Sequence, residues 1–305
     1  MGLAIMSNLL LILFCFAAGF FLKTKHKHLN LPANTPQGIN AFVLYVSLPA
    51  MAFYYVPKIE FSLKALVPLT MGLIVLLGAV LFFAFLQKML HYDKKVLGCL
   101  VLCSGLGNVS FLGYPLIEAF YGKEGIKTAV LCDQGTFLVL STLGILLANF
   151  YAGKQATWKV IGLKLLHFPA FTAFLIALGL NFVQIDFPEI IQSVWKRFAD
   201  ALSPLALFSV GWQISWEKEN NLWKETFAGL FYKLLLIPCI FWLFIPQPMG
   251  LAEKVVILQT AMAPMITASI IAVEYHLAPN LANLLIRMGV PISLLTTSFW
   301  WWLMG

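Results

Sequence analysis

The sequence predicts an all-α polytopic membrane protein, and two observations carry this prediction. Of its 305 residues, 61% are hydrophobic and only 11% are charged, and the mean hydropathy is +0.87. A soluble domain is usually about 45–50% apolar and about 25% charged, so a soluble fold of this length would have too few charges to cover its apolar surface. The apolar runs are also long and unbroken, whereas a transmembrane β-barrel has short segments of alternating hydropathy.

Ten apolar runs are long enough to cross a bilayer, which takes about 20 residues of helix. The sixth and seventh runs are the least regular, because Lys164, His167, Lys196, Arg197 and Asp200 lie at or inside their ends. The connections are short and leave no room for a soluble catalytic domain. The predicted spans are residues 3–22, 37–56, 65–87, 96–120, 125–150, 160–183, 190–215, 222–245, 253–276 and 279–303.

Basic residues in the connecting loops predict the orientation. With the N-terminus outside, the inner loops hold eleven lysines and the outer loops hold seven Lys or Arg residues. This bias predicts that both termini are extracytoplasmic, in the inner (plasma) membrane of a bacterial-type cell. The net charge of +7 comes largely from these loops, so we expect the lipid bilayer as a partner and no nucleic acid.

Sequence similarities recur about half a chain apart. Five spans separate the members of each pair, and because five is odd, the second half would enter the membrane in the opposite orientation. The pattern predicts a 5+5 inverted repeat with residues 1–152 and 153–305 as its halves, which is typical of secondary transporters. Chance is the alternative, since Pro and Gly are common in membrane helices. The pairs are "SLPAMAF" (47–53) with "LSPLALF" (202–208), Pro115 with Pro264, and "AAGFFL" (17–22) with "ALGLNF" (177–182).

The fourth span contains a predicted helix break, in "GNVSFLGYPL" (107–116). Pro115 lacks a backbone donor and clashes with the preceding turn, and Gly113 eases unwinding. The freed backbone groups must face protein or a water-filled cavity. Asn108 lies two turns before Pro115, on the same face of a continuous helix, and offers an amide near the break.

The ninth span repeats this composition with Gln259, Thr260, Pro264 and Thr267. Interrupted helices at corresponding positions of two inverted halves indicate a binding site near the middle of the membrane. The N-termini of the half-helices would favour an anion. A pair of ordinary proline kinks is the alternative interpretation.

Two ionisable residues, Asp133 and Arg287, lie well inside the fifth and tenth spans. Ionisable groups in a membrane are costly and usually face a cavity, a partner or a substrate. One hypothesis has Arg287 binding a substrate carboxylate and Asp133 exchanging a coupling proton. The other has the two residues in a permanent structural pair. Lys233 is expected to snorkel towards the interface.

These motifs resemble the auxin efflux carrier family of membrane transporters. That family includes plant auxin exporters and bacterial proteins associated with malate, malonate and related carboxylates. The resemblance extends over nearly the whole chain, although the long central loop of the plant exporters is absent. It is carried by "NVSFLGYPL" (108–116), "AFYG" (119–122), "LQTAMAP" (258–264), "VEY" (273–275), "FVLYVSLPAMAF" (42–53) and "PLALFSVG" (204–211).

The resemblance implies an architecture similar to that of the bile-acid symporters. Spans 1, 2, 6 and 7 would form a scaffold that dimerises, and spans 3–5 and 8–10 would form a mobile transport domain. Spans 4 and 9 would cross at their breaks, with Asn108, Pro115 and Pro264 as substrate contacts. With Gly113, Gln259, Thr267 and Arg287, these residues make up the predicted substrate site.

The sequence therefore predicts a secondary active transporter of a small organic anion that works by alternating access of the elevator type. We expect no cofactor apart from a coupling ion, H⁺ or Na⁺. A membrane-bound carboxylate sensor is the alternative. An enzyme is not expected, since no Walker A loop, Gly-x-Ser-x-Gly or His-Glu-x-x-His motif is present. The five cysteines lie in apolar runs without the spacing of metal ligands, so no metal site is predicted.

Overall fold

The computed structural model describes residues 2–26, 28–32, 34–59, 65–153, 169–185, 187–213 and 222–305. Within these ranges the chain forms helices and one isolated antiparallel bridge, and no strand. Five of the described helical stretches are long and apolar enough to cross a membrane, which confirms the all-helical membrane class. They are Thr35–Lys58, Leu66–Leu90, Gly113–Ala152, Trp223–Phe244 and Pro279–Met304. The count of ten spans and their inverted repeat stay predictions.

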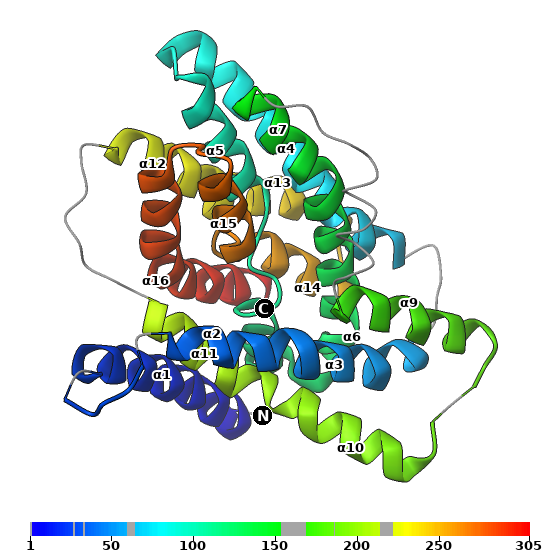
Figure 1. Cartoon of the computed structure of the whole chain (residues 1–305). Helices are drawn as coiled ribbons and strands as arrows, with labels where there is room; N and C mark the ends of the chain where they lie inside the picture. Colours follow the sequence, from blue (N-terminus) through cyan, green and yellow to red (C-terminus); the bar gives the residue numbers. More distant parts are fainter. Residues whose placement is uncertain are drawn as a thin grey trace. The chain divides into compact units, whose positions relative to one another are not determined.

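The helices fall into two compact units (Figure 1), and each unit draws segments from both halves of the sequence. Unit 1 comprises Met1–Ser62, Ser110–Val130 and Leu165–Ser215, and unit 2 comprises Leu63–Val109, Leu131–Lys164 and Trp216–Gly305. The two units therefore do not coincide with the two sequence halves.

Unit 1 is built around a close contact between its first and last helices, α1 and α11. A Cβ atom added to Gly19 would lie 2.1 Å from the Phe208 carbonyl oxygen, and one added to Gly211 would lie 2.1 Å from that of Phe16. Only glycine permits so close an approach of the two backbones. The helices of unit 1 are α1 (Gly2–Lys25), α2 (Thr35–Phe42), α3 (Leu48–Tyr55), α9 (Pro169–Phe182), α10 (Glu189–Asp200) and α11 (Leu202–Gln213).

Two predicted spans have a different form in unit 1. A π-helical turn at Val43–Ser47 joins α2 to α3, so the second span is continuous. The seventh span, predicted as residues 190–215, is divided into α10 and α11, with Ala201 between them. The part of the sixth span before Pro169 lies outside the described residues, as do Lys164 and His167.

Unit 2 contains the first part of the interrupted fourth span and the whole of the interrupted ninth span. Helix α5 packs against α4, α7, α15 and α16, and α14 packs against α4, α13 and α16. The helices are α4 (Leu66–Leu90), α5 (Lys94–Gly105), α7 (Ile145–Ala152), α12 (Trp223–Phe231), α13 (Ile237–Phe244), α14 (Leu251–Thr260), α15 (Ile266–Glu274) and α16 (Pro279–Met304). Helix α6 (Gly113–Val139) begins in unit 1 and ends in unit 2.

Helix α6 is interrupted at Gly122, where the backbone has φ 69° and ψ −168°. This conformation is readily adopted only by glycine. The interruption separates the end of the predicted fourth span from the predicted fifth span, as the sequence indicates.

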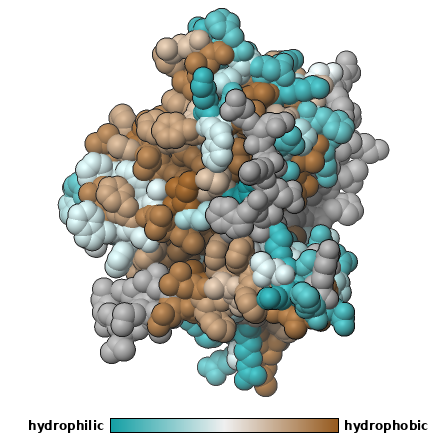
Figure 2. All heavy atoms as spheres, turned by 90° about the vertical axis from the view of Figure 1, so that its left-hand side faces the viewer, coloured by the Kyte–Doolittle hydropathy of each residue, from teal (hydrophilic) through white to brown (hydrophobic). Residues whose placement is uncertain are grey.

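Large apolar side chains are exposed on both units, and they cover much of the face shown in Figure 2. Leu81 of α4, Phe227 of α12 and Phe244 of α13 are each more than 70% exposed. Extended apolar surface of this kind is rare on soluble proteins. It is expected where helices face lipid.

Candidate binding site at the paired helix breaks

Two helices of unit 2 stop in the middle of their spans. Helix α5 ends at Gly105, and the next helix begins at Gly113, after seven non-helical residues. Helix α14 ends at Thr260, and α15 begins at Ile266. We call residues 106–109 the first break and residues 261–265 the second break.

The two breaks pair with each other in antiparallel fashion. Gly107 lies opposite Pro264. The Asn108 amide N–H donates to the Ala263 carbonyl oxygen at 2.8 Å, and the Met265 N–H donates to the Leu106 carbonyl oxygen at 3.0 Å. The backbone groups released by the breaks therefore find partners inside the protein, as a membrane requires. This exchange has a local twofold symmetry that relates positions about half a chain apart, as an inverted repeat would.

The first break lies earlier in the chain than the proline predicted. Pro115 is in the first turn of α6, where the missing backbone donor costs less than in a helix interior. Asn108 is in the extended pairing segment, so its predicted position on one helical face with Pro115 is wrong. Pairing with the second break, with Leu106 in an extended conformation, ends α5.

Two side-chain amides at the paired breaks are buried with unmet hydrogen-bonding capacity. Asn108 is 3% exposed, and its Nδ2 has no partner among the described residues. Gln259 is fully buried; its Nε2 donates to the Val109 carbonyl oxygen at 3.3 Å, but its Oε1 accepts nothing within the described ranges. An unsatisfied buried polar group costs about 1–3 kcal/mol. Such groups are uncommon in native proteins and need an explanation, and the described residues hold several others outside the breaks.

A lysine that the sequence analysis assigned to the interface also lies at the breaks. Lys233 is 1% exposed, so the snorkelling prediction is wrong. Its Nζ donates to the Thr260 carbonyl oxygen at 2.8 Å, and a Cβ atom added to Gly107 would lie 2.8 Å from the same Nζ. Its position was a usable signal: Lys233 is about eleven residues into the predicted span 222–245, or about 16 Å along a helix. That depth is beyond the reach of its side chain to either interface.

The π-helical turn Tyr232–Leu236, between α12 and α13, holds this lysine. Such turns insert an extra residue into a helix and occur often at functional sites. The neighbouring Tyr232 hydroxyl donates to the Val75 carbonyl oxygen of α4 at 2.6 Å, which fixes the turn against that helix.

Several other predicted site residues lie elsewhere. Thr267 is exposed on α15, and Gly113 and Pro115 belong to the unit 1 part of α6. Pro115 lines a cavity of about 130 Å³ in unit 1 together with Glu118 and Asp200. The structure thus brings Asn108, Gln259 and Pro264 together. Thr267 is not part of this group, because its side chain is exposed.

The cavity at Pro115 has polar groups that are already engaged. The Ser203 hydroxyl donates to a Glu118 carboxylate oxygen at 2.9 Å, and Asp200 forms ion pairs with Lys123 and Lys196. These contacts describe a packed and partly exposed polar corner of unit 1.

The two ionisable residues predicted inside spans differ in burial. Asp133 is 4% exposed and accepts a hydrogen bond at 3.1 Å from Gln134 Nε2, whereas Arg287 is half-buried on α16. Gly289 of the same helix packs against Pro264, since an added Cβ would lie 2.6 Å from the proline Cδ. Residues two apart on a helix do not share a face, so Arg287 leaves α16 on another side. Both hypotheses for Asp133 and Arg287, a permanent structural pair and a working substrate and proton site, stay predictions.

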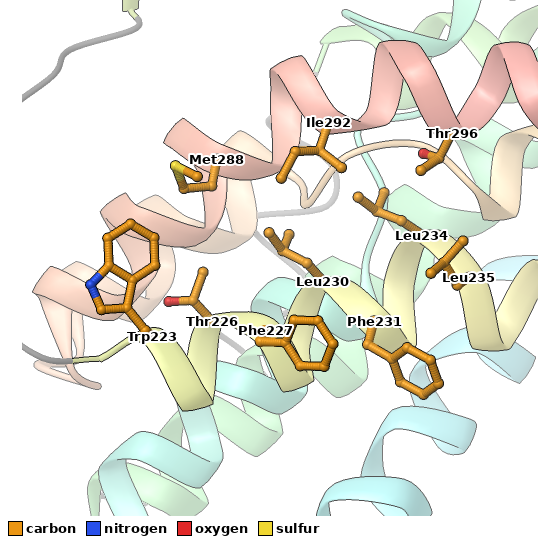
Figure 3. A pocket seen from close by; sticks show the side chains of 10 residues that line it. All are labelled: Trp223, Thr226, Phe227, Leu230, Phe231, Leu234, Leu235, Met288, Ile292 and Thr296. Atoms are coloured by element: carbon orange, nitrogen blue, oxygen red, sulfur yellow. The ribbon is translucent and has the colours of Figure 1, made fainter.

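A cavity in unit 2 is an apolar groove of about 250 Å³ that α12 and the π-helical turn Tyr232–Leu236 form with α16 (Figure 3). Its only hydroxyls, Thr226 and Thr296, donate to backbone carbonyls of their own helices. The groove therefore offers an organic anion no charged partner, and the indole N–H of Trp223 is the one other side-chain donor in its lining. Its lining residues are Trp223, Thr226, Phe227, Leu230, Phe231, Leu234, Leu235, Met288, Ile292 and Thr296.

Comparison with known proteins agrees with this architecture. A family model described as "Membrane transport protein" matches residues 4–301. An uncharacterized transporter of Methanocaldococcus jannaschii is 24% identical over 98% of each chain. An uncharacterized transporter of Methanothermobacter thermautotrophicus is 25% identical over 86% of this chain and 87% of its own.

Proposed function

The chain belongs to the membrane transport protein family, that of the auxin efflux carriers, and from this premise we propose that it is a secondary active transporter of a small organic anion. The substrate class we propose is a carboxylate such as malate, malonate or an auxin-like acid. The family assigns transport in general, and the paired breaks support the choice of substrate.

The observation that carries the proposal is the set of buried polar atoms with spare capacity at the breaks. Asn108 Nδ2 is a donor with no partner among the described residues, and Gln259 Nε2 has a second N–H beyond the one that it donates to Val109. Helix α15 begins directly after Met265, so its first backbone N–H groups point towards the second break. Together with the positive end of the helix dipole, these donors favour a negatively charged ligand.

The mechanism we propose is alternating access of the elevator type. Spans 3–5 and 8–10, which include the paired breaks, would form the transport domain. Spans 1, 2, 6 and 7 would be the scaffold through which a homodimer forms. Asp133 would exchange the coupling proton, with Na⁺ as the alternative coupling ion. The chain would act in the inner membrane, with both termini outside.

The test is uptake of labelled carboxylates into sealed proteoliposomes, with malate, malonate and indole-3-acetate in parallel. We expect uptake of at least one carboxylate to follow an imposed pH gradient, and Asp133→Asn to uncouple uptake from that gradient. Arg287→Ala separates the two hypotheses for that residue, because loss of substrate affinity supports the working site. Folded protein that binds a carboxylate but gives no flux would contradict the proposal and favour a sensor.

A further inference from the structure

The buried cation at the breaks needs a physical explanation. Lys233 has its ammonium in the middle of a predicted span, and no carboxylate lies within 4 Å of it in the described part of the chain. A charged group at that depth in a membrane is costly and is usually paired or functional. An ammonium donates three hydrogen bonds, and Nζ makes one, to Thr260.

Capping of α14 does not explain why this residue carries a charge. Thr260 is the last residue of α14, and its carbonyl is one of the four that a helix leaves unsatisfied at its C-terminus. A neutral donor such as an amide or a hydroxyl would satisfy this carbonyl without burying a charge. The charge is therefore surplus to a structural role, and an anionic partner would stabilise it.

The surroundings of Nζ show where such a partner would lie. Nζ is next to Gly107 on the first break and bonded to Thr260 at the edge of the second. Each of these residues is adjacent in sequence to a buried amide with spare capacity, Asn108 and Gln259 respectively. The spare donors of the ammonium and of Asn108 thus belong to one small region of unit 2. That region suits a carboxylate, which accepts several hydrogen bonds.

We propose that Lys233 is the cationic group that binds the carboxylate of the substrate at the paired breaks. The ammonium rests on the Thr260 carbonyl when the site is empty and donates to the carboxylate when the site is occupied. This assignment rests on the proposed function for the identity of the ligand as an organic anion. It gives the principal charge recognition to Lys233 rather than to Arg287.

The experiment measures the shift in the midpoint of thermal unfolding that a carboxylate causes in the full-length protein in detergent. The carboxylates are malate, malonate and indole-3-acetate. A bound ligand raises this midpoint, because it binds the folded state only. The test variant is Lys233→Met, and Lys233→Arg is the charge-retaining variant. Lys254→Met is the matched control, because Lys254 Nζ also donates to a backbone carbonyl at 2.8 Å, that of Gly305, but at an exposed site.

We expect a carboxylate to stabilise the wild type and the control, and affinity to fall at least about tenfold in Lys233→Met. Lys233→Arg should recover part of the shift. Without ligand, Lys233→Met should unfold at or above the wild-type midpoint, because a buried charge is removed. A merely structural lysine would give the reverse pattern, with a lowered midpoint and an undiminished ligand shift.

Gly107→Ala provides a variant that keeps the lysine. The new methyl group would lie 2.8 Å from Nζ, at the flexible end of the side chain, so the ammonium is displaced at little cost to folding. We expect this variant to fold normally and to bind the carboxylate more weakly. Normal affinity in both Gly107→Ala and Lys233→Met would overturn the proposal.

The outcomes separate this proposal from the proposed function. A wild type that no carboxylate stabilises would overturn the assignment of Lys233, whereas uptake of some other solute would leave transport intact. A shift lost in Lys233→Met, in a protein that gives no flux in proteoliposomes, would support the anion site and overturn the transport function.

Discussion

An asparagine side chain is buried at the end of α3 in unit 1, and another is buried at the paired breaks in unit 2. Only the first has hydrogen-bond acceptors for its amide. Asn181 Nδ2 donates to the carbonyl oxygens of Val56, Pro57 and Ile59, at 3.2, 2.8 and 3.0 Å. Asn108 is also buried, and its Nδ2 has no acceptor among the described residues. The carbonyls at the end of a helix need a donor, and Asn181 supplies it. A buried donor without an acceptor is unexpected in a native protein.

The lysines of the two regions show the same contrast. Lys196 and Lys123 of unit 1 share the carboxylate of Asp200 at a partly exposed site. Lys233 of unit 2 is buried with one carbonyl as its acceptor. The polar groups compared in unit 1 are therefore satisfied internally, although buried atoms of Ser47, Tyr121 and Trp195 elsewhere in that unit have no partner among the described residues, while the breaks in unit 2 retain donors that we propose for a ligand. The comparison separates polar residues that hold the fold from those that we propose bind the substrate.

The largest change in stability is expected for Asn181→Ala. It removes the donor of three carbonyl oxygens at the end of the second span and should lower the free energy of unfolding by about 2–3 kcal/mol. Uptake per folded molecule should not change, because the residue lies outside the breaks. Denaturant titration in detergent measures the first quantity. A neutral effect on stability would break the comparison.

Gln259→Leu should affect transport more than stability. It removes a weak bond of 3.3 Å to Val109 together with an unsatisfied oxygen, and these changes partly offset each other. We expect the uptake rate of the carboxylate to fall about tenfold, as for the loss of the hydrogen bond that the second N–H of Nε2 would donate to a charged group. Initial rates in proteoliposomes measure this effect, and Gln192→Leu, which also removes an amide donor to a backbone carbonyl but lies in unit 1, is a control for the substitution itself. Unchanged uptake would remove Gln259 from the site.

Tyr232→Phe should have a smaller effect, confined to stability. The change removes the hydroxyl that donates to Val75 and should lower the free energy of unfolding by about 1 kcal/mol. The substitution leaves Lys233 in place beside it, so carboxylate affinity should stay within about twofold of wild type. A large loss of affinity would show that the π-helical turn, rather than the ammonium, controls binding.

Lys196→Ala should have the smallest effect. The ion pair with Asp200 is partly exposed on both sides, and such pairs contribute about 0–1 kcal/mol. We expect a shift of the unfolding midpoint that disappears at high salt, and no change in uptake. A loss comparable with that of Asn181→Ala would mean that this polar corner of unit 1 also holds a required charge.

The sequence was sufficient to predict the fold class and the existence of both breaks. Composition predicted the fold class, and clusters of Gly, Pro, Asn and Gln inside apolar runs predicted the two breaks. The exact start of the first break was not predictable, because α5 ends where it pairs with a segment about half a chain away. Pro115, the strongest local signal, lies in the first turn of the following helix.

Lys233 shows why local pattern also failed at the candidate site. A lysine in an apolar run usually reaches the interface. Whether it turns inward depends on the π-helical turn that holds it and on the glycine at position 107 that leaves room for its ammonium. These are tertiary features with no local signature. Its depth in the span was the one available indication.

The central claim is that the polar groups of the paired breaks bind the transported anion, and Asn108 tests it most directly. The measurement is the initial rate of carboxylate uptake by Asn108→Ala and Asn181→Ala proteoliposomes, each normalised to folded protein. We predict a rate at least about tenfold below wild type for Asn108→Ala, because a donor to a charged ligand is lost, and a wild-type rate for Asn181→Ala. Equal rates in the two variants would contradict the account.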